Sequence, residues 1–169
     1  MVTRNSIHAR LANAARPQSG APSGWATLTP ALRVADVRSA CDFYGSVGFE
    51  VEQTLPGPEG NWSWAQLRMG SSRIWLNDIE TPTGNARRDR AEERGPRGLG
   101  MTIYAYVSDL ESVRDAWVAQ GRALDTDIHD EYWGDRSFTA TDPYGFTWTF
   151  ATHVRTVSME ERTAVAIDH

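Results

Sequence analysis

Residues 32–51, LRVADVRSACDFYGSVGFEV, return in a related form as residues 105–124, AYVSDLESVRDAWVAQGRAL. The two copies align without a gap at an offset of 73 residues. The matching positions are Val34 and Val107, Asp36 and Asp109, Ser39 and Ser112, Asp42 and Asp115, Tyr44 and Trp117, Gly48 and Gly121, and Val51 and Leu124. In each copy a short strand ends at the aspartate, which can cap the helix that follows. The glycine ends that helix by adopting a left-handed conformation. The chain is therefore predicted to contain two similar halves.

Apolar residues in both copies have the i, i+3, i+4, i+7 spacing of an amphipathic helix. The predicted helix faces are Val37, Ala40, Cys41 and Tyr44 in the first copy, and Leu110, Val113 and Trp117 in the second. Strands are predicted over Phe49–Leu55, Asn61–Met69, Ser72–Asp78, Arg122–Asp125, Asp135–Thr141 and Phe146–Thr152. Turn residues such as Gly70-Ser71 and Asp142-Pro143-Tyr144-Gly145 separate them. The order predicts an α+β fold in which two tandem βαβββ modules form a curved, cup-shaped mixed sheet.

The predicted domain organisation follows from the repeat. Residues 1–26 are expected to be a disordered tail, 27–80 the first module, 81–99 a linker, 100–153 the second module and 154–169 a C-terminal extension with a weak helical pattern. The arginines of the linker alternate with acidic residues, which favours a solvated loop over an anion site. Whether this segment orders on binding stays open.

Composition excludes several classes of function. The net charge of −5 argues against nucleic acid as a partner. The one cysteine, Cys41, cannot form an internal disulfide and is expected in the core. No apolar run is long enough for a membrane helix, and the first 26 residues lack the apolar stretch of a secretory signal. A cytoplasmic protein is expected.

Residues 27–153 resemble the vicinal oxygen chelate superfamily, the glyoxalase, bleomycin-resistance and dioxygenase group. The motifs that carry the resemblance are Leu32-Arg33-Val34-Ala35-Asp36, Asp42-Phe43-Tyr44, Gly48-Phe49-Glu50-Val51, Val107-Ser108-Asp109, Trp133-Gly134-Asp135-Arg136 and Asp142-Pro143-Tyr144-Gly145-Phe146-Thr147-Trp148. The tail from Ala151-Thr152-His153 to Ser158-Met159-Glu160-Glu161 is similar to a PhnB-like branch. The resemblance implies the fold, whereas members of the superfamily differ in chemistry.

The resemblance also implies where a divalent metal would sit. Metal-dependent members use His or Gln from the first strand of each module and Glu from the last strand. Carried onto this chain, those positions fall on Thr29, Trp75, Thr102 and Thr149. Neither a threonine hydroxyl nor an indole is a ligand of the kind this chemistry needs. No histidine pair has ligand spacing on one element. The prediction is that there is no metal site and no cofactor.

Strand alternation predicts what lines the cup instead. The inward residues would be Thr29 and Arg33; Arg73, Trp75 and Asn77; Thr102, Tyr104 and Tyr106; and Thr149. Trp133 would border the cleft, while Trp62 and Trp64 share a face that lines either the cleft or a dimer interface. Trp117 and Trp148 are expected in the core, and Trp25 in the tail or at an interface. Such a cleft suits a flat or conjugated organic ligand, with Arg33 and Arg73 able to meet a carboxylate.

Three functions remain open. The first is a metal-free protein that sequesters a small aromatic molecule such as an antibiotic, as a homodimer with or without strand swapping. The second is a metal-free isomerase, cyclase or hydrolase of natural-product metabolism, with Asp130, Glu131 or His153 as acid or base. The third, a metal-dependent lyase or dioxygenase, is disfavoured by the missing ligands. The replaced metal-ligand positions favour a binding protein over an enzyme. The sequence does not identify the ligand. Asp135 is expected to form an ion pair with Arg136 or a strand-end hydrogen bond.

Overall fold

The structure is a computed structural model that describes residues 28–80 and 98–167. The first half consists of β1 (Ala31–Val34), α2 (Val37–Ser46), β2 (Glu50–Pro56), the 3-10 turn η1 (Pro58–Gly60), β3 (Trp62–Met69) and β4 (Ser72–Asp78). The second half consists of β5 (Thr102–Tyr106), α4 (Leu110–Ala119), β6 (Thr126–Asp130), β7 (Asp135–Thr141) and β8 (Thr147–His153), followed by α5 (Met159–Ile167). The predicted α+β fold of two βαβββ modules is confirmed.

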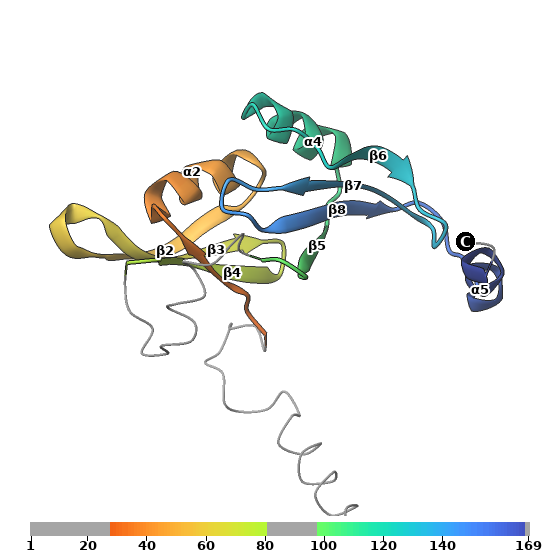
Figure 1. Ribbon diagram of the computed structural model, residues 1–169, viewed down its shortest axis with the longest axis horizontal. Coiled ribbons are helices and arrows are strands. Elements are labelled where there is room, and N and C mark those ends of the chain that lie inside the picture. The colour runs from red at the N-terminus through yellow and green to blue at the C-terminus, as the bar shows by residue number, and fades with distance from the viewer. Residues whose placement is uncertain (1–27, 81–97, 168–169) are drawn as a thin grey trace, which may run out of the picture.

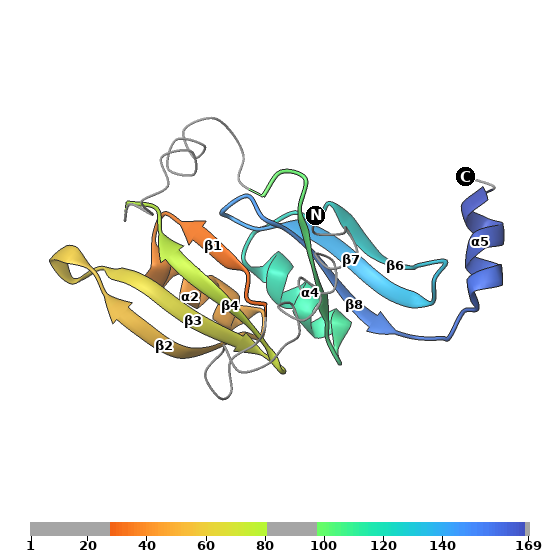
Figure 2. The same ribbon diagram turned by 90° about the horizontal axis from the view of Figure 1, so that it is seen from below.

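Each half forms its own four-stranded sheet. Sheet one has the strand order β1-β4-β3-β2 and sheet two the order β5-β8-β7-β6. The pairs β1–β4 and β5–β8 are parallel, and the other neighbours are antiparallel. Helices α2 and α4 lie on the same side of the molecule (Figure 1), and the two sheets lie side by side when it is seen from below (Figure 2). We call the face of each sheet that points away from its helix its open face.

The repeated aspartates cap both helices, as predicted. The Oδ1 atom of Asp36 accepts a hydrogen bond of 3.0 Å from the backbone N–H of Ser39, and Asp109 accepts the equivalent bond of 3.0 Å from Ser112. These bonds satisfy donors that the first turn of a helix otherwise leaves open. Each cap lowers the pKa of its carboxyl group, led in both cases by the bond from the serine backbone.

One predicted strand was misplaced. The sequence indicated a strand over residues 122–125, but β6 comprises Thr126–Asp130, for which no strand was predicted. The physical reason is the position of β6 at the edge of sheet two, where, among the described strands, β7 alone pairs with it. An edge strand open to solvent can consist of polar residues, so it shows no apolar alternation.

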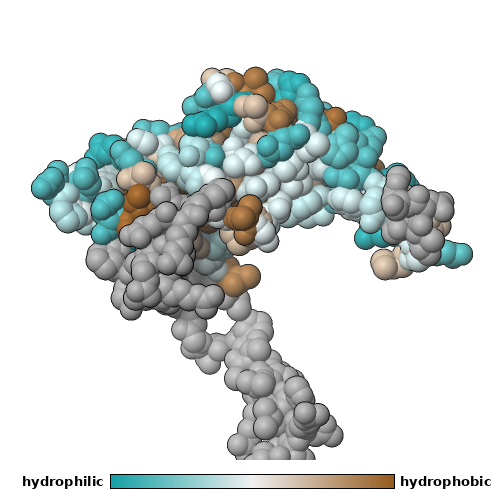
Figure 3. Space-filling model, in the orientation of Figure 1, coloured by the Kyte–Doolittle hydropathy of each residue, from teal (hydrophilic) through white to brown (hydrophobic). Residues whose placement is uncertain are grey.

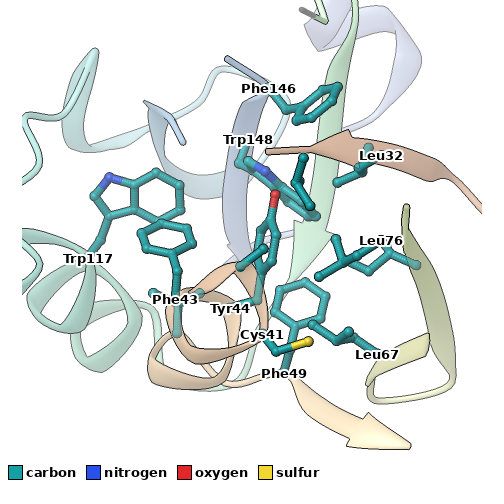
Figure 4. Packing of buried hydrophobic residues seen from close by; sticks show 14 of the residues in the cluster. Leu32, Cys41, Phe43, Tyr44, Phe49, Leu67, Leu76, Trp117, Phe146 and Trp148 are labelled. Atoms are coloured by element: carbon teal, nitrogen blue, oxygen red, sulfur yellow. The ribbon is translucent and has the colours of Figure 1, made fainter. Parts of the chain in front are cut away.

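The hydrophobic core joins the two halves. Helix α2 contributes Phe43 and Tyr44, whose rings contact Trp117 and Trp148 of the second half at centroid distances of 5.1 and 5.7 Å (Figure 4). Trp117, Trp148 and Cys41 are buried, as the sequence predicted. Because one helix packs against both halves, the two modules share a single contiguous core, and we expect them to unfold together.

A buried polar contact reinforces this junction. The Tyr44 hydroxyl donates a hydrogen bond to Asp142, which also accepts one of 3.0 Å from the Trp148 indole. Backbone N–H groups of Tyr144 and Phe146 fill the other carboxylate oxygen at 2.8 and 2.9 Å. Burial raises the pKa of Tyr44 well above its usual value, and the Asp142 charge adds to that rise. The tyrosine therefore stays protonated and remains a donor to the loop between β7 and β8.

The remaining surface is mostly hydrophilic, with scattered small apolar groups on the face shown (Figure 3). Helix α5 stands apart from both sheets (Figures 1 and 2). Over the described part of the chain, no helix is both long and apolar enough to cross a membrane. The predicted tail, Trp25 and nearly all of the predicted linker lie outside the described residues.

Candidate functional site

A buried carboxylate organises the open face of sheet two. Asp135, at the start of β7, is only 3% exposed. Its Oδ2 atom accepts hydrogen bonds from the hydroxyls of Tyr106 and Tyr104, at 2.8 and 3.2 Å, and from the Trp133 indole at 3.1 Å. Its Oδ1 atom lies 2.9 Å from Nδ1 of His153. One carboxylate thus fixes four side chains from β5, the loop before β7, and β8. We call these five residues the Asp135 cluster.

The cluster holds its protons in a defined arrangement. Burial raises the pKa of Asp135, but the hydrogen bonds from His153, the two tyrosines and Trp133 outweigh burial, so the net pKa is lowered. Desolvation raises the pKa of Tyr104 to about 12, and the bond to Asp135 is the main cause of the raised pKa of Tyr106. At neutral pH the cluster therefore contains an ionised carboxylate and two neutral phenols.

The two tyrosine rings of the cluster are anchored at one end and accessible elsewhere. Tyr104 is 41% exposed and Tyr106 is 63% exposed, although both hydroxyls are bound to a buried group. Their ring centroids are 5.3 Å apart. Tyr106 pairs in register with Ala151 of β8, whose small side chain leaves room beside the ring. Anchored aromatic rings of this kind offer binding area at a low entropy cost.

The acidic residues nearest in sequence to the cluster are already engaged. Asp130 forms a two-point ion pair with Arg136, at 2.6 and 3.1 Å, which lowers the pKa of Asp130. Glu131 accepts a hydrogen bond of 2.7 Å from Ser137 and lies 3.2 Å from Nε2 of His129. The expected ion pair between Asp135 and its neighbour is therefore not formed, because the arginine turns toward β6 instead.

The open face of sheet one carries a second aromatic group. Trp75 of β4 meets Trp64 of β3 edge to face at a centroid distance of 6.0 Å. The Trp75 indole donates a hydrogen bond of 2.9 Å to Gln66, whose amide donates one of 2.8 Å to Glu52. Glu52 also accepts two bonds from Arg73, at 2.7 and 3.1 Å. This face therefore combines an indole pair with a charged, hydrogen-bonded border.

The structure separates two tryptophans that the sequence placed on one face. A β-bulge interrupts the pairing of β2 with β3, so that Leu55 faces Trp64 whereas Pro56 faces Trp62. The bulge shifts the side-chain alternation. Trp62 consequently packs against the core on the helix side, with the Arg38 guanidinium 4.7 Å from its ring.

The other predicted residues of the first module have smaller roles. Arg33 is 5% exposed, and its guanidinium donates a hydrogen bond to the backbone carbonyl of Ile79. Asn77 is half-buried and pairs in register with Arg33 and Trp64. Thr29 is half-buried and precedes β1. The guanidinium of Arg33 is thus directed to the backbone. Of the two predicted arginines, Arg73 is the one that lines the cleft described next.

A cleft of about 460 Å³ lies between the two sheets. It is mainly apolar, and its lining is Leu28, Pro30, Phe49, Met69, Gly70, Ser71, Ser72, Arg73, Ile74, Ile103, Tyr104, Ala105, Tyr106 and Trp148. The volume falls in the range of small-molecule sites. Of the predicted ligand contacts, this cleft brings together Arg73, Tyr104 and Tyr106. Trp75, Trp64 and Trp133 lie on the adjoining open faces, outside the lining.

The four positions where relatives would hold a metal do not suit one. Trp75 uses its indole N–H to bind Gln66, and Thr149 shares a hydrogen bond of 3.0 Å with Thr139. Thr102 pairs in register with Thr147, so threonines occupy both strands at that point. Residues 28–80 and 98–167 contain no group of three His, Cys, Asp or Glu side chains arranged to hold a metal ion. These side chains offer hydroxyls and an indole rather than a divalent ligand set.

Comparison with known proteins agrees with this geometry. The model of the Glyoxalase/Bleomycin resistance protein/Dioxygenase superfamily matches residues 26–150. The chain belongs to this superfamily. The resemblance seen in the sequence motifs is thereby confirmed. The superfamily assignment covers both modules and the cleft between them.

Individual relatives extend the comparison. Mb0911c, an uncharacterised protein of Mycobacterium bovis, is 33% identical over 135 residues, which cover 79% of this chain and 88% of the relative. The crystal structure of TioX from Micromonospora sp. ML1 has a TM-score of 0.60 at 20% identity and covers 75% of this chain and 98% of its own. The PhnB protein from Bacillus cereus has a TM-score of 0.56 at 15% identity and covers 74% of this chain and 98% of its own. The TioX and PhnB structures therefore share the fold of this chain.

Sequence reasoning missed the organising residues of both faces. The sequence predicts only a local contact for Asp135, and no sequence pattern points to Gln66 or Glu52. A signal for Asp135 was available, because an aspartate beginning a strand shares its face with Ser137, Thr139 and the opposing His153. The Glu52 contacts depend on the irregular pairing near Val51 and could not have been foreseen from alternation.

Proposed function

We propose that this superfamily member binds a small aromatic or conjugated organic molecule, such as an antibiotic, without a metal, and sequesters it in the cleft between the two sheets. The observation that carries the proposal is the cleft of about 460 Å³, whose lining includes Tyr104 and Tyr106, both anchored on Asp135. The apolar lining supplies most of the binding energy, and the rings give the ligand a stacking surface.

Polar groups at the border would orient the ligand. Arg73 lies in the lining and is held by Glu52, so its guanidinium is placed before a ligand arrives. A guanidinium held in this way can bind a carboxylate or stack on a conjugated system. The open faces beside the cleft, with Trp75 and Trp64 on one side and Trp133 on the other, would contact the parts of a larger ligand that extend beyond the cleft.

The proposal includes a homodimer. Leu28, in the cleft lining, is 84% exposed, Leu99 before β5 is 85% exposed, and Met159 on the detached helix α5 is 72% exposed. Large apolar side chains exposed in this way are typical of surfaces that another chain covers. A partner chain would enclose the cleft and give helix α5 a surface to pack on, and exchange of α5 between the two chains would make the dimer helix-swapped. Light scattering coupled to gel filtration would give twice the monomer mass of 18.8 kDa.

Binding can be tested with a panel of aromatic antibiotics and quenching of tryptophan fluorescence. Trp148 lines the cleft, so a ligand there should change the emission. For a compound that binds, Tyr106→Ala should raise the Kd about tenfold, because a lost ring pair costs about 1 kcal/mol and contact area is lost as well. Tyr106→Phe keeps the ring and should stay within about threefold of the wild type.

The outcome against the proposal is equally clear. If no compound in a broad panel quenches, or if Tyr106→Ala and Trp75→Ala both leave the Kd of every ligand unchanged, sequestration in this cleft is wrong. A control is Tyr132→Phe, since that exposed hydroxyl lies outside the cleft lining and should not affect binding.

A further inference from the structure

The positive charge in the cleft lining is already neutralised. Among the described residues of the lining, Arg73 is the one charged side chain. Its Nε and Nη2 atoms donate hydrogen bonds of 2.7 and 3.1 Å to the two carboxylate oxygens of Glu52. The side chains of Arg73 and Glu52 are 21% and 23% exposed, so water screens this ion pair only in part. A ligand in the cleft therefore meets a guanidinium whose charge is balanced, rather than a free cation.

The charges around this ion pair keep it balanced. The hydrogen bond from Arg73 is the main cause of the lowered pKa of Glu52, and the bond of 2.8 Å from the Gln66 amide adds to it. Arg68 lies 3.3 Å from Glu52 and also pairs with Glu50. Two arginines and two glutamates thus neutralise one another, and Glu52 stays ionised beside Arg73.

The tyrosines of the lining are committed to an anion as well. The hydroxyls of Tyr106 and Tyr104 donate hydrogen bonds of 2.8 and 3.2 Å to the buried Asp135, whose pKa is lowered. A hydroxyl has a single proton, so neither tyrosine can donate to a ligand while these bonds hold. A ligand anion near these hydroxyls would meet oxygen lone pairs, with the charge of Asp135 behind them. This part of the lining therefore also disfavours a carboxylate.

We propose that the cleft selects uncharged aromatic ligands over aromatic carboxylates, and that Glu52 is the residue that sets this preference. The inference rests on the proposed binding of aromatic molecules and names the class of ligand. A carboxylate that enters the mainly apolar cleft loses hydration and finds no uncompensated cation there. An uncharged ligand loses less hydration, can stack on the guanidinium of Arg73, and can accept a hydrogen bond from Ser71 or Ser72 of the lining.

Two probes of nearly the same shape test the preference. At neutral pH 2-naphthamide is uncharged, whereas 2-naphthoate carries a carboxylate on the same ring system. Titration of the full-length protein, followed by the methyl NMR signals of Met69, Ile74 and Ile103 in the lining, gives a Kd for each probe. The wild type should bind 2-naphthamide about tenfold more tightly than 2-naphthoate. Equal affinities, or tighter binding of 2-naphthoate, would overturn the inference.

Two matched charge removals on β2 assign the preference to one residue. Glu52→Gln removes the charge that balances Arg73, so the ratio of the 2-naphthoate Kd to the 2-naphthamide Kd should fall from about ten to about one. Glu50→Gln removes an equal charge two residues away, from a carboxylate that pairs with Arg68, and should leave the ratio within about twofold of the wild type. A general disturbance of the cleft would weaken both probes and leave the ratio in place. A ratio that does not fall in Glu52→Gln would overturn the role of Glu52.

A double variant tests whether the effect acts through the arginine. In Glu52→Gln/Arg73→Gln the cleft again offers no free cation, so the Kd ratio should return to about ten. A ratio that stays near one would contradict the role given to Arg73. Should Glu52→Gln not fold, the wild-type ratio and the double variant still decide the inference.

Failure of the inference and failure of the proposed function give different results. If 2-naphthoate shifts the cleft methyl signals and binds as tightly as 2-naphthamide, the cleft binds aromatic molecules and only the preference is wrong. If neither probe shifts these signals, the inference is refuted, while the antibiotic panel decides the proposed function separately.

Discussion

Replacing Tyr44 by phenylalanine removes one atom from the junction between the modules. The hydroxyl lies on a fully buried side chain of α2 and donates to Asp142, which is 4% exposed. The carboxylate also accepts from Trp148, and two backbone N–H groups fill its other oxygen. The variant keeps the ring and its contacts with Phe43, Phe49 and Trp148, so only the hydrogen bond is lost.

The magnitude follows from what the lost donor leaves behind. A hydrogen bond to a charged group contributes about 1.5–3 kcal/mol, and a buried acceptor has no water to replace the donor. Because three donors remain on Asp142, we expect a loss of about 2 kcal/mol in the free energy of unfolding. For a chain of this size, that corresponds to a fall in Tm of roughly 4–8 °C.

Urea denaturation followed by circular dichroism and tryptophan fluorescence would measure this loss. A matched control is Tyr132→Phe, which removes a hydroxyl from a tyrosine that is 42% exposed and should change stability by less than about 0.5 kcal/mol. If Tyr44→Phe were as stable as the wild type, the bond to Asp142 would not hold the halves together. Two separate transitions in the wild type would contradict the single cooperative core.

Three further predictions concern Gly134, the thiol of Cys41 and the carboxylate of Asp135. Gly134→Ala should destabilise the fold by about 3 kcal/mol or more in urea denaturation, because its φ is 100° and an added Cβ would lie 2.0 Å from the Arg155 carbonyl oxygen. Cys41 should not react with a disulfide reagent until urea unfolds the protein, since burial raises the pKa of its thiol to about 11; rapid reaction of the native thiol would refute this. The pKa of Asp135 is lower in the folded state, so its stabilisation is present above about pH 4 and is lost as pH falls through the folded pKa. The Tm of Asp135→Asn should therefore fall less than that of the wild type between pH 5 and pH 3. If Tm fell equally with pH in both proteins, the lowered pKa of Asp135 would be contradicted.

The sequence was sufficient for the fold because the repeat encodes local features twice. Asp36 and Asp109 both cap their helices, and the buried faces of α2 and α4 follow the predicted spacing. These features depend on neighbours within four residues. The edge strand β6 was misplaced because exposed polar residues carry no periodic signal.

The site was predictable only in part, for a physical reason. Alternation correctly placed Tyr104 with Tyr106, and Arg73 with Trp75, on the open faces. It could not show that Asp135 binds the two tyrosines, because those bonds cross 29 and 31 residues of sequence. Alternation also predicted that Trp62 shares a face with Trp64, which is wrong because a single β-bulge turns Trp62 to the helix side. Long-range contacts and irregular pairing are set by the whole fold rather than by local pattern.

Methyl NMR during a ligand titration tests the central claim most directly. Met69, Ile74 and Ile103 line the cleft, whereas Ile128 lies on β6 outside the lining and serves as an internal control. A quenching aromatic compound bound in the cleft should shift the methyl signals of the first three residues and leave Ile128 unchanged, through ring-current effects that act only at short range. Shifts at Ile128 alone, or none at the cleft methyls at saturating ligand, would contradict the claim that this cleft binds the molecule.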